Sequence, residues 1–361
     1  MTPAVRTDVP LGPLTTLGVG GPARELVTAE TERDLVDAVR EADDRGAPLL
    51  VLGGGSNLLV ADRGFAGRVV RVATRGVSHD PAGDRVAVTA SAGEPWDAFV
   101  AACVAENLAG LECLSGIPGL AGATPIQNVG AYGQEVADTV THVRAWDRLA
   151  REVVTLPAAA CGFAYRDSHF KGAHAGRYVV LAVTFALSPS GAPSLRYGEL
   201  TRALAGEPAP SLARVREAIL TLRRAKSMVL DPRDPETRSA GSFFTNPIVD
   251  VDVADRVEAL ARASGALREG ESMPRFAAPH GRVKLAAGWL IERAGVTRGE
   301  TSGRAAVSRS HALALVAREG CTAAEVVALA RSVQRRVSDR WGVALAPEPV
   351  QTGFAAGEGL G

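Results

Sequence analysis

The sequence predicts a mixed α/β protein with two glycine-rich ligand loops. Helix and strand patterns alternate along the first half of the chain, and one glycine-rich run directly follows a buried strand pattern. The size agrees, because 361 residues with 46% hydrophobic and 22% charged side chains can bury a substantial core. A chain of this length is expected to divide into two or three domains.

The first α/β unit is expected between residues 31 and 60. Thr31 can cap a helix that runs to about Arg45, and a short buried strand pattern follows over 47–52. This strand leads into the run Gly53-Gly54-Gly55-Ser56-Asn57-Leu58. Glycines let the main chain approach a ligand, and Ser56 and Asn57 add hydrogen-bonding side chains. The run is therefore a candidate phosphate loop.

A second candidate loop covers residues 115–133 and holds five glycines, two prolines and no charged side chain. Pro118 and Pro125 restrict the backbone, which indicates a shaped loop. A long surface loop is the alternative, because glycine and proline cluster in any loop. The apolar side chains favour a ligand loop, since a solvated loop does not need them: Ile117, Leu120, Ile126 and Val129.

The remaining elements follow from periodicity and turn residues. Ser211 is expected to cap an amphipathic helix that ends in the basic cluster Arg223-Arg224-Ala225-Lys226. The proline-rich stretch 188–210 before it indicates a domain boundary. The chain closes with an extended piece over 343–350. Further strands are predicted over 67–73, 85–90, 140–146, 151–156, 178–187 and 312–316, and helices over 96–108, 253–263, 284–294 and 322–341.

Composition excludes several classes of protein. Lys plus Arg equals Asp plus Glu at 40 each, so the chain as a whole offers no field for nucleic acid or an acidic membrane surface. No stretch approaches the roughly 18 to 20 apolar residues of a membrane span, and we expect a cytoplasmic protein. Histidine spacings match no metal motif, and the four cysteines, expected as buried free thiols, form no C-x-x-C pair: Cys103, Cys113, Cys161 and Cys321.

One glycine motif near the start is rejected as a dinucleotide fingerprint. Gly18-Val19-Gly20-Gly21-Pro22-Ala23 has the spacing G-x-G-x-x-A. That spacing has meaning only directly after a buried strand and at the start of a helix. Residues 11–17 hold a glycine, a proline and two threonines, and Pro22 interrupts the motif itself.

Three polar positions are candidates for chemistry, each with a structural alternative. Arg166 lies in Tyr165-Arg166-Asp167-Ser168, which is also typical of a surface turn. Glu348 lies between two prolines and could be a carboxylate in an exposed tail. Ser242 precedes two phenylalanines that are poorly placed on a solvated loop, and a shielded hydroxyl beside a cleft can donate a proton. No G-x-S-x-G elbow surrounds it, so a hydrolase triad is unsupported.

A series of motifs extends in one order over nearly the whole chain. The runs are Gly20-Gly-Pro-Ala23, Gly53-Gly-Gly-Ser-Asn-Leu58, residues 116–133, Tyr165-Arg-Asp-Ser168, Ala240-Gly-Ser-Phe-Phe-Thr-Asn-Pro247, Lys284-Leu-Ala-Ala-Gly-Trp-Leu-Ile291 and Pro347-Glu348. In these runs the chain resembles the UDP-N-acetylenolpyruvoylglucosamine reductase family, flavoenzymes of peptidoglycan precursor synthesis. Gly-Ser-Phe-Phe at 241–244 and Tyr197 resemble the first subtype, which keeps a tyrosine-bearing insert.

The resemblance implies a fold of the vanillyl-alcohol-oxidase-like class and a division into four segments. Residues 1–70 and 71–215 would form two subdomains that hold FAD. Residues 216–330 would form an α+β domain that binds the UDP-sugar. Residues 331–361 would return to the FAD subdomains. A monomer without an obligate protein partner is expected, although the sequence alone leaves the oligomeric state open.

The resemblance also implies the chemistry. NADPH would reduce FAD, and the flavin N5 would pass hydride to C3 of the enolpyruvyl substrate. By matching motif, Arg166 would supply a cation beside the substrate carboxylate, and Ser242 would donate a proton to C2. Glu348 would polarise the carboxylate together with Arg166. The preference for NADPH over NADH and the protonation state of Glu348 stay open.

The matching positions imply two sets of binding residues. Tyr197, Lys226 and Asn246 would contact the UDP-sugar, although a long spacer after Lys226 leaves Arg223 or Arg224 as alternatives at the diphosphate. The expected FAD-binding residues lie on the two glycine-rich loops: Gly53, Gly54, Gly55, Ser56, Asn57, Leu58, Ser115, Gly116, Gly119, Gly122, Ala123, Thr124, Ile126, Asn128 and Gly130.

Two other functions compete with the reductase. A related FAD oxidase of sugars or alcohols would reoxidise rapidly with oxygen, but the Gly-Ser-Phe-Phe and Glu348 motifs argue against it. A non-catalytic UDP-sugar sensor would not need the Ser242 hydroxyl.

Overall fold

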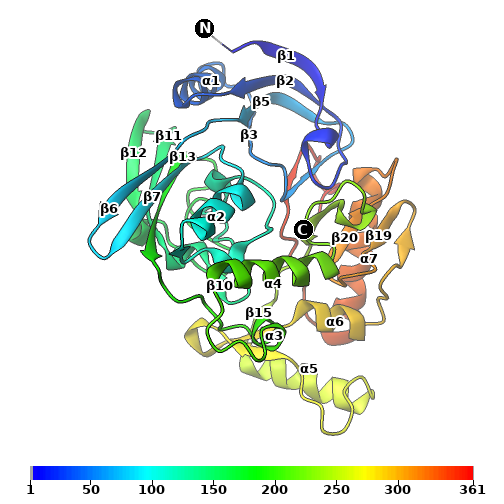
Figure 1. Ribbon diagram of the computed structural model, residues 1–361. Coiled ribbons are helices and arrows are strands. Elements are labelled where there is room, and N and C mark those ends of the chain that lie inside the picture. Colours follow the sequence, from blue (N-terminus) through cyan, green and yellow to red (C-terminus); the bar gives the residue numbers. More distant parts are fainter. Residues whose placement is uncertain (1–2, 361) are drawn as a thin grey trace. The chain divides into compact units, whose positions relative to one another are not determined.

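Two structural units share the chain in alternating segments. The computed structural model describes residues 3–360 (Figure 1). Unit 1 comprises the residues up to Pro10 together with Pro22–Ser56 and Phe65–Leu230, and unit 2 comprises Leu11–Gly21, Asn57–Gly64 and the residues from Asp231 onward. The chain therefore passes from unit 1 to unit 2 inside the first glycine-rich run.

Unit 1 begins with a four-stranded sheet in the order β1-β2-β5-β3. β1 is antiparallel to β2, whereas β5 is parallel to both β2 and β3. Helix α1 packs on this sheet, and Thr31 and Asp34 form a capping box at its start. The elements are β1 Val5–Pro10, β2 Pro22–Ala29, α1 Glu32–Asp44, β3 Leu49–Leu52 and β5 Phe65–Val72.

A second, antiparallel sheet of unit 1 has the order β12-β11-β13-β7-β6, and β8 pairs with the end of β13. Helix α2 places Trp96 and Phe99 against Phe185 of β13, with ring centroids 5.5 to 5.8 Å apart. These rings belong to the main core of the unit. The elements are β6 Val77–Ala82, β7 Arg85–Ser91, α2 Trp96–Ala105, β8 Leu108–Ala109, β11 Val140–Asp147, β12 Glu152–Pro157 and β13 Tyr178–Pro189.

The rest of unit 1 consists of a short hairpin and two helices. The hairpin strands β9 and β10 lie at the end of the second glycine-rich run. Ser211 caps α4, whose apolar face packs on α3 and on Cys113. The elements are β9 Gly130–Ala131, β10 Gln134–Glu135, α3 Gly198–Ala203 and α4 Leu212–Ala225.

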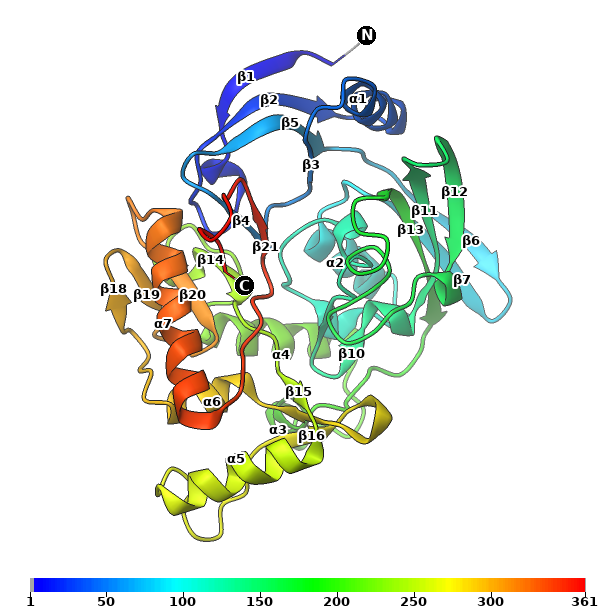
Figure 2. The same cartoon turned by 180° about the vertical axis from the view of Figure 1, so that it is seen from behind.

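In the described part of unit 2, the chain forms three small sheets and three α-helices. Strands β4 and β21 pair in parallel, β14-β20-β19-β18 form a sheet that α7 covers, and β15-β17-β16 form the third sheet (Figure 2). The Trp341 Nε1 of α7 donates to the Leu290 carbonyl of α6 at 2.9 Å. The elements are β4 Leu58–Val60, β14 Ser239–Ser242, β15 Ile248–Val249, α5 Val251–Ala263, β16 Arg275–Ala277, β17 Val283–Leu285, α6 Ala287–Arg293, β18 Thr301–Ser302, β19 Ala305–Val307, β20 Ala314–Ala317, α7 Ala323–Trp341 and β21 Val350–Thr352.

The predicted periodic elements are confirmed with shifted ends, and several short strands were missed. The helix predicted over 96–108 ends at Ala105, since Leu108 begins β8. The helix predicted over 284–294 begins only at Ala287, because Lys284 belongs to β17. In the piece expected to be extended over 343–350, only the last residue is in a strand. β1, β2 and β6 were not predicted, because their polar, proline-containing sequences lack a clear alternation.

Other expectations meet mixed outcomes. No dinucleotide fingerprint operates at Gly18, because a 3-10 turn over Gly12–Leu14 precedes it and the next strand starts at Pro22. The predicted segment borders at 215 and 330 fall inside α4 and α7, and the four-segment division stays a prediction. Cys103, Cys113 and Cys161 are buried free thiols, whereas Cys321 is half-buried.

Between residues 3 and 360, none of the helices has the length and apolar character needed to cross a membrane.

A buried arginine links α1 to the first sheet of unit 1. The Arg68 side chain on β5 is 1% exposed. Its Nη2 lies 2.8 Å from Glu25 of β2, and its Nη1 lies 2.7 Å from Glu41 of α1. A charge taken out of water needs such partners, and removal of one partner leaves the others uncompensated.

We expect Arg68→Ala to lower the free energy of unfolding by about 2–4 kcal/mol, because it opens a cavity and leaves Glu25 and Glu41 with only the partly exposed Arg45 as a partner. Urea denaturation measures the effect. Arg71→Ala is the matched control on the same strand, since Arg71 is exposed, and its effect should stay within about 0.5 kcal/mol. Equal loss in both variants would contradict this role for Arg68.

Candidate functional site

The first glycine-rich loop presents a row of free main-chain donors. It begins directly after β3, as predicted, and Gly55 has a φ of 62°. Within the described residues 3–360, the N–H groups of Gly53–Ser56 donate no hydrogen bond in the protein. Adjacent uncommitted amides are the donor set that binds phosphate oxygens without a cation.

The two glycine-rich loops meet main chain to main chain within unit 1. A Cβ on Gly54 would lie 2.8 Å from the Gly119 Cα, a distance that real Cβ atoms do not show. Gly119 has a φ of 118°, and a Cβ there would lie 2.8 Å from the Ser56 hydroxyl oxygen. Both positions therefore require glycine, and the loops form one continuous backbone surface.

The second loop is shaped by its own hydrogen bonds. The side chains of Ser115, Thr124 and Asn128 are buried. Ser115 and Thr124 donate to main-chain carbonyls at 2.6 and 2.7 Å. The Asn128 Nδ2 donates to Glu135 at 2.7 Å, and its Oδ1 accepts from the Ala137 N–H. These side chains therefore hold the fold of the loop itself.

Further positions of the loop confirm that it is not a solvated tether. Ile117, Leu120 and Val129 pack against the core of unit 1, whereas Ile126 is 36% exposed. A Cβ on Gly122 would lie 2.4 Å from the Ala92 Cβ, which shows how closely the loop approaches the turn between β7 and α2. Ala123 is exposed.

Asp97 ties the start of the second loop to two helices. Its carboxylate accepts from the Gly116 N–H at 2.6 Å and from both terminal nitrogens of Arg216 at 2.6 and 3.0 Å. Burial opposes ionisation of this carboxyl, but the hydrogen bonds from Arg216 and Gly116 outweigh it and hold its pKa below the ordinary value. The anchor is therefore ionised at neutral pH.

Arg166 lies in unit 1 at the far end of the same loop. Its Nη2 donates to the Gly130 carbonyl at 2.7 Å, and its guanidinium carbon lies 5.5 Å from the ring centroid of Tyr165. A Cβ on Gly130 would lie 3.3 Å from Nη1, so a glycine there makes room for the guanidinium. Arg166 itself has a φ of 55°, which is uncommon for a residue with a side chain.

Unit 2 brings three predicted site residues from distant parts of the chain together. The Glu348 N–H donates to the carbonyl of Phe243, the neighbour of Ser242, at 2.9 Å. The Asn57 Nδ2 donates to the Glu348 carbonyl at 3.3 Å, and the Val350 N–H donates to the Asn57 carbonyl at 3.0 Å. Ser242, Glu348 and Asn57 therefore lie on adjoining backbone segments.

The aromatic pair after Ser242 is buried, as the sequence indicated. Phe243 and Phe244 are 0% and 1% exposed and stack edge to face with centroids 5.3 Å apart. Ser242 itself is half-buried at the end of β14. Leu58, by contrast, is a buried residue of β4 whose backbone pairs with Val350 of β21.

The residues expected to bind the UDP-sugar separate into two groups. Tyr197 and Lys226 lie in unit 1 around Tyr132, whose ring contacts Tyr197 edge to face at 5.4 Å. Asn246 lies in unit 2, where its Oδ1 accepts from the Ala287 N–H at the start of α6. The Lys226 Nζ lies 2.6 Å from Glu199.

Two residues that contact Tyr197 or Lys226 in unit 1 were not predicted from the sequence, Tyr132 and Glu199. Tyr132 stands inside the second glycine-rich run, and Glu199 stands two residues after Tyr197 in the insert. An aromatic and an acid at these places were the available signals. Of the alternatives to Lys226, Arg224 is exposed, whereas Arg223 donates to the Met228 carbonyl and its burial lowers its pKa.

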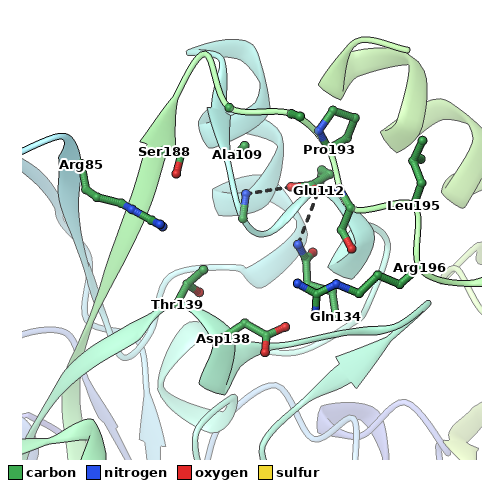
Figure 3. A pocket seen from close by; sticks show the side chains of 14 residues that line it. Arg85, Ala109, Glu112, Gln134, Asp138, Thr139, Ser188, Pro193, Leu195 and Arg196 are labelled. Carbon is green, nitrogen blue, oxygen red and sulfur yellow. Dashed lines mark hydrogen bonds between the residues drawn. The ribbon is translucent and has the colours of Figure 1, made fainter. Parts of the chain in front are cut away.

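A polar cavity of about 510 Å³ lies beside the insert in unit 1. Figure 3 shows Arg85 and Arg196 on opposite sides of it, together with the Glu112 carboxylate, which accepts from Gln134 and from the Gly110 N–H. None of the predicted site residues lines it. One wall is the stem of the insert, residues 191–196, which precedes Tyr197.

The described residues fit a flavin dinucleotide. Its pyrophosphate matches the free amides of Gly53–Ser56, and the loop contact at Gly54 gives those amides a rigid base. The two glycine-rich loops carry no acidic side chain that would repel the pyrophosphate and no basic side chain that would compete with the amides for it.

Comparisons with known proteins agree with this geometry. A family model for an FAD binding domain matches residues 23–155, and one for the UDP-N-acetylenolpyruvoylglucosamine reductase C-terminal domain matches residues 233–352. A UDP-N-acetylenolpyruvoylglucosamine reductase of Thermobifida fusca is 50% identical over 358 residues, which cover 98% of this chain and 99% of that protein.

The chain belongs to the UDP-N-acetylenolpyruvoylglucosamine reductase family. A reductase of Nocardia farcinica is 53% identical over 355 residues and covers 97% of this chain and 90% of that protein. The crystal structure of the Thermus caldophilus reductase is 26% identical with a TM-score of 0.65, over 98% of this chain and 99% of that one. The resemblance and the mixed α/β fold with an FAD-binding domain are thereby confirmed.

The two family models divide the site of this reductase family member. The FAD model spans both glycine-rich loops, and the C-terminal model spans Ser242, Asn246 and Glu348. Arg166, Tyr197 and Lys226 fall between the two matched ranges. The roles of individual residues stay predictions.

We expect Gly54→Ala to weaken FAD binding by about tenfold, because overpacking of this kind costs roughly 1–3 kcal/mol and moves the two loops apart. Titration of the stripped protein with FAD measures the change. Gly172→Ala is the control, since its Cβ would meet nothing closer than 3.3 Å. Unchanged FAD affinity in Gly54→Ala would contradict a cofactor role for the loop contact.

We expect Asp97→Asn to lower the free energy of unfolding at pH 7 by about 1–2 kcal/mol, because charge-assisted hydrogen bonds are lost. A carboxyl with a depressed folded-state pKa stabilises the protein above its unfolded-state pKa, and this stabilisation is lost as the pH falls through the folded value. The difference from the wild type should therefore shrink below about pH 4. Denaturation curves across pH, with exposed Asp84→Asn as control, test this; a difference that does not depend on pH would refute it.

Proposed function

We propose that this protein is an NADPH- and FAD-dependent reductase that converts UDP-N-acetylglucosamine enolpyruvate to UDP-N-acetylmuramate in peptidoglycan precursor synthesis. Full-length similarity to proteins named for this reduction supports the assignment. The structural observation that carries it is the hydrogen bond between the Glu348 N–H and the Phe243 carbonyl. It joins the backbone segments of the proposed proton donor and the proposed carboxylate partner.

When bound, FAD supplies hydride chemistry: it is reduced by NADPH and gives hydride to C3 of the enol ether. The protein must then stabilise charge on the substrate carboxylate and provide a proton at C2. Arg166 is the proposed cation, since a guanidinium matches the geometry of a carboxylate. Its attachment to the Gly130 carbonyl orients it at the end of the second glycine-rich loop.

Ser242 is the proposed proton donor to C2. A serine hydroxyl is a weak acid, so the transfer requires a strongly basic acceptor and good alignment. Burial of Phe243 and Phe244 fixes the backbone beside it, and its strand pairs with β20 at Ala314. Glu348 is the proposed partner of Arg166 at the carboxylate.

Binding is assigned to the remaining residues. The free amides of Gly53–Ser56 and the main chain of the second loop are proposed to hold the FAD pyrophosphate. Tyr197, Lys226 and Asn246 are proposed to contact the UDP-sugar, with Lys226 at its diphosphate. A cytoplasmic location and a monomeric state without an obligate protein partner belong to the same proposal.

The spectrum of the purified protein tests the function. The protein should be yellow, NADPH should bleach it under anaerobic conditions, and UDP-N-acetylglucosamine enolpyruvate should restore the colour. UDP-N-acetylglucosamine, which lacks the enol ether, is the control and should not. A protein that takes up no FAD, or whose reduced flavin is reoxidised by oxygen but not by the enolpyruvyl substrate, would refute the reductase.

We expect Ser242→Ala to slow reoxidation of the flavin by substrate by about 100-fold or more. The rate of flavin reduction by NADPH should stay within about twofold of the wild-type rate. Stopped-flow measurement of each half-reaction separates the two. Ser302→Ala, a half-buried serine of the same sheet, is the matched control. Equal losses in both half-reactions, or an unchanged rate of reoxidation by substrate, would rule out the proton-donor role.

A further inference from the structure

An ion pair in unit 1 occupies the lysine proposed to bind the diphosphate. The Lys226 Nζ lies 2.6 Å from the Glu199 Oε2, and the two side chains are 31% and 29% exposed. Lys226 ends helix α4, whereas Glu199 lies in the first turn of α3, directly after Tyr197 and Gly198. The pair therefore connects the tyrosine-bearing insert to α4.

The Lys226 ammonium also lies near the ring of Tyr132. The Lys226 Nζ lies 5.7 Å from the ring centroid of Tyr132, and Tyr197 contacts that ring edge to face. Burial raises the pKa of Tyr132 to about 12, so the ring stays neutral and attracts the ammonium through its face. If the Lys226 ammonium separates from Glu199, it therefore keeps its favourable contact with the Tyr132 ring.

The glycine-rich loop makes room for this arrangement. Gly133 has a φ of 78°, and a Cβ there would lie 3.3 Å from the Arg196 Cβ and 3.7 Å from the Tyr197 Cβ. The insert therefore approaches the end of the loop closely. Arg223, the other cation near Tyr132, has a lowered pKa through burial and donates to the Met228 carbonyl.

Charge decides which ligand can take the place of Glu199. A partly exposed carboxylate–ammonium pair is weak, because water screens it. A diphosphate diester carries more negative charge than one carboxylate and more acceptor oxygens, so it competes well for an ammonium. A neutral ligand has no group with which to compete.

We propose that Glu199 is an internal competitor that occupies Lys226 in the ligand-free protein and is displaced by a diphosphate. This inference rests on the proposed function, since it takes Lys226 as the diphosphate contact. Each ligand that uses Lys226 must first break the pair, so the pair lowers the affinity for such ligands and leaves the affinity for other ligands unchanged.

The test is calorimetric titration of the full-length, FAD-loaded protein with UDP-N-acetylglucosamine and with uridine. Glu199→Gln should bind UDP-N-acetylglucosamine about twofold to fivefold more tightly than the wild type, because it removes a weak competing ion pair. Its affinity for uridine should not change. Glu199→Asp restores a carboxylate and should return the affinity toward the wild-type value.

Two further variants separate this effect from a general loss of charge. Glu207→Gln breaks a similar pair of the same helix, with Arg214 at 2.9 Å, and should leave both affinities unchanged. In a Lys226→Met background, Glu199→Gln should give no further tightening, because the two effects couple through one contact. Tightening of the same size in that background, or none in Glu199→Gln alone, would overturn the proposal.

The test of Glu199 and the test of the reductase function can fail independently of each other. Turnover of the enolpyruvyl substrate by the wild type together with unchanged affinity in Glu199→Gln defeats only the role of Glu199. Tighter binding by Glu199→Gln without any turnover by the wild type supports the competition for Lys226 and defeats the reductase assignment.

Discussion

The contact between the main chains of Gly54 and Gly119 is the constraint on which the candidate site depends. A single Cβ on Gly54 would stand 2.8 Å from the opposite backbone. Because both residues lack side chains, two loops from different parts of unit 1 form one surface with a row of free amides. Such a surface binds an anion through fixed dipoles, without the desolvation of a buried cation.

Helix α4 joins this surface to the second half of the site. Arg216 in its middle holds Asp97, which in turn holds the Gly116 N–H. Lys226 at its end contacts Glu199 and faces Tyr132. A displacement of α4 would therefore change the cofactor loop and the proposed diphosphate contact together. The polar cavity beside the insert leaves the stem of residues 191–196 without dense packing on that side.

In unit 2, hydrogen bonds between distant backbone segments position the proposed site residues. Strand β14, the segment around Glu348 and Asn57 are joined by backbone and side-chain hydrogen bonds. Buried Phe243 and Phe244 supply the apolar anchor for this junction. A weak acid such as serine transfers a proton only when it is held in line with its acceptor, and a rigid backbone on both sides meets that requirement.

The long periodic elements, the two glycine-rich loops and the motifs that show the family can all be predicted from local sequence patterns. The capping residues Thr31 and Ser211 and the clustered glycines of the two loops are local signals. Three contacts are visible only in the folded chain: Gly54 with Gly119, Asn57 with Glu348, and Glu199 with Lys226. These pairs are far apart in sequence, and contacts of that kind depend on how the elements pack, which no local pattern encodes. The same reason explains why the short strands β1 and β6 were missed, since their neighbours in the sheets stabilise them and their own sequences do not.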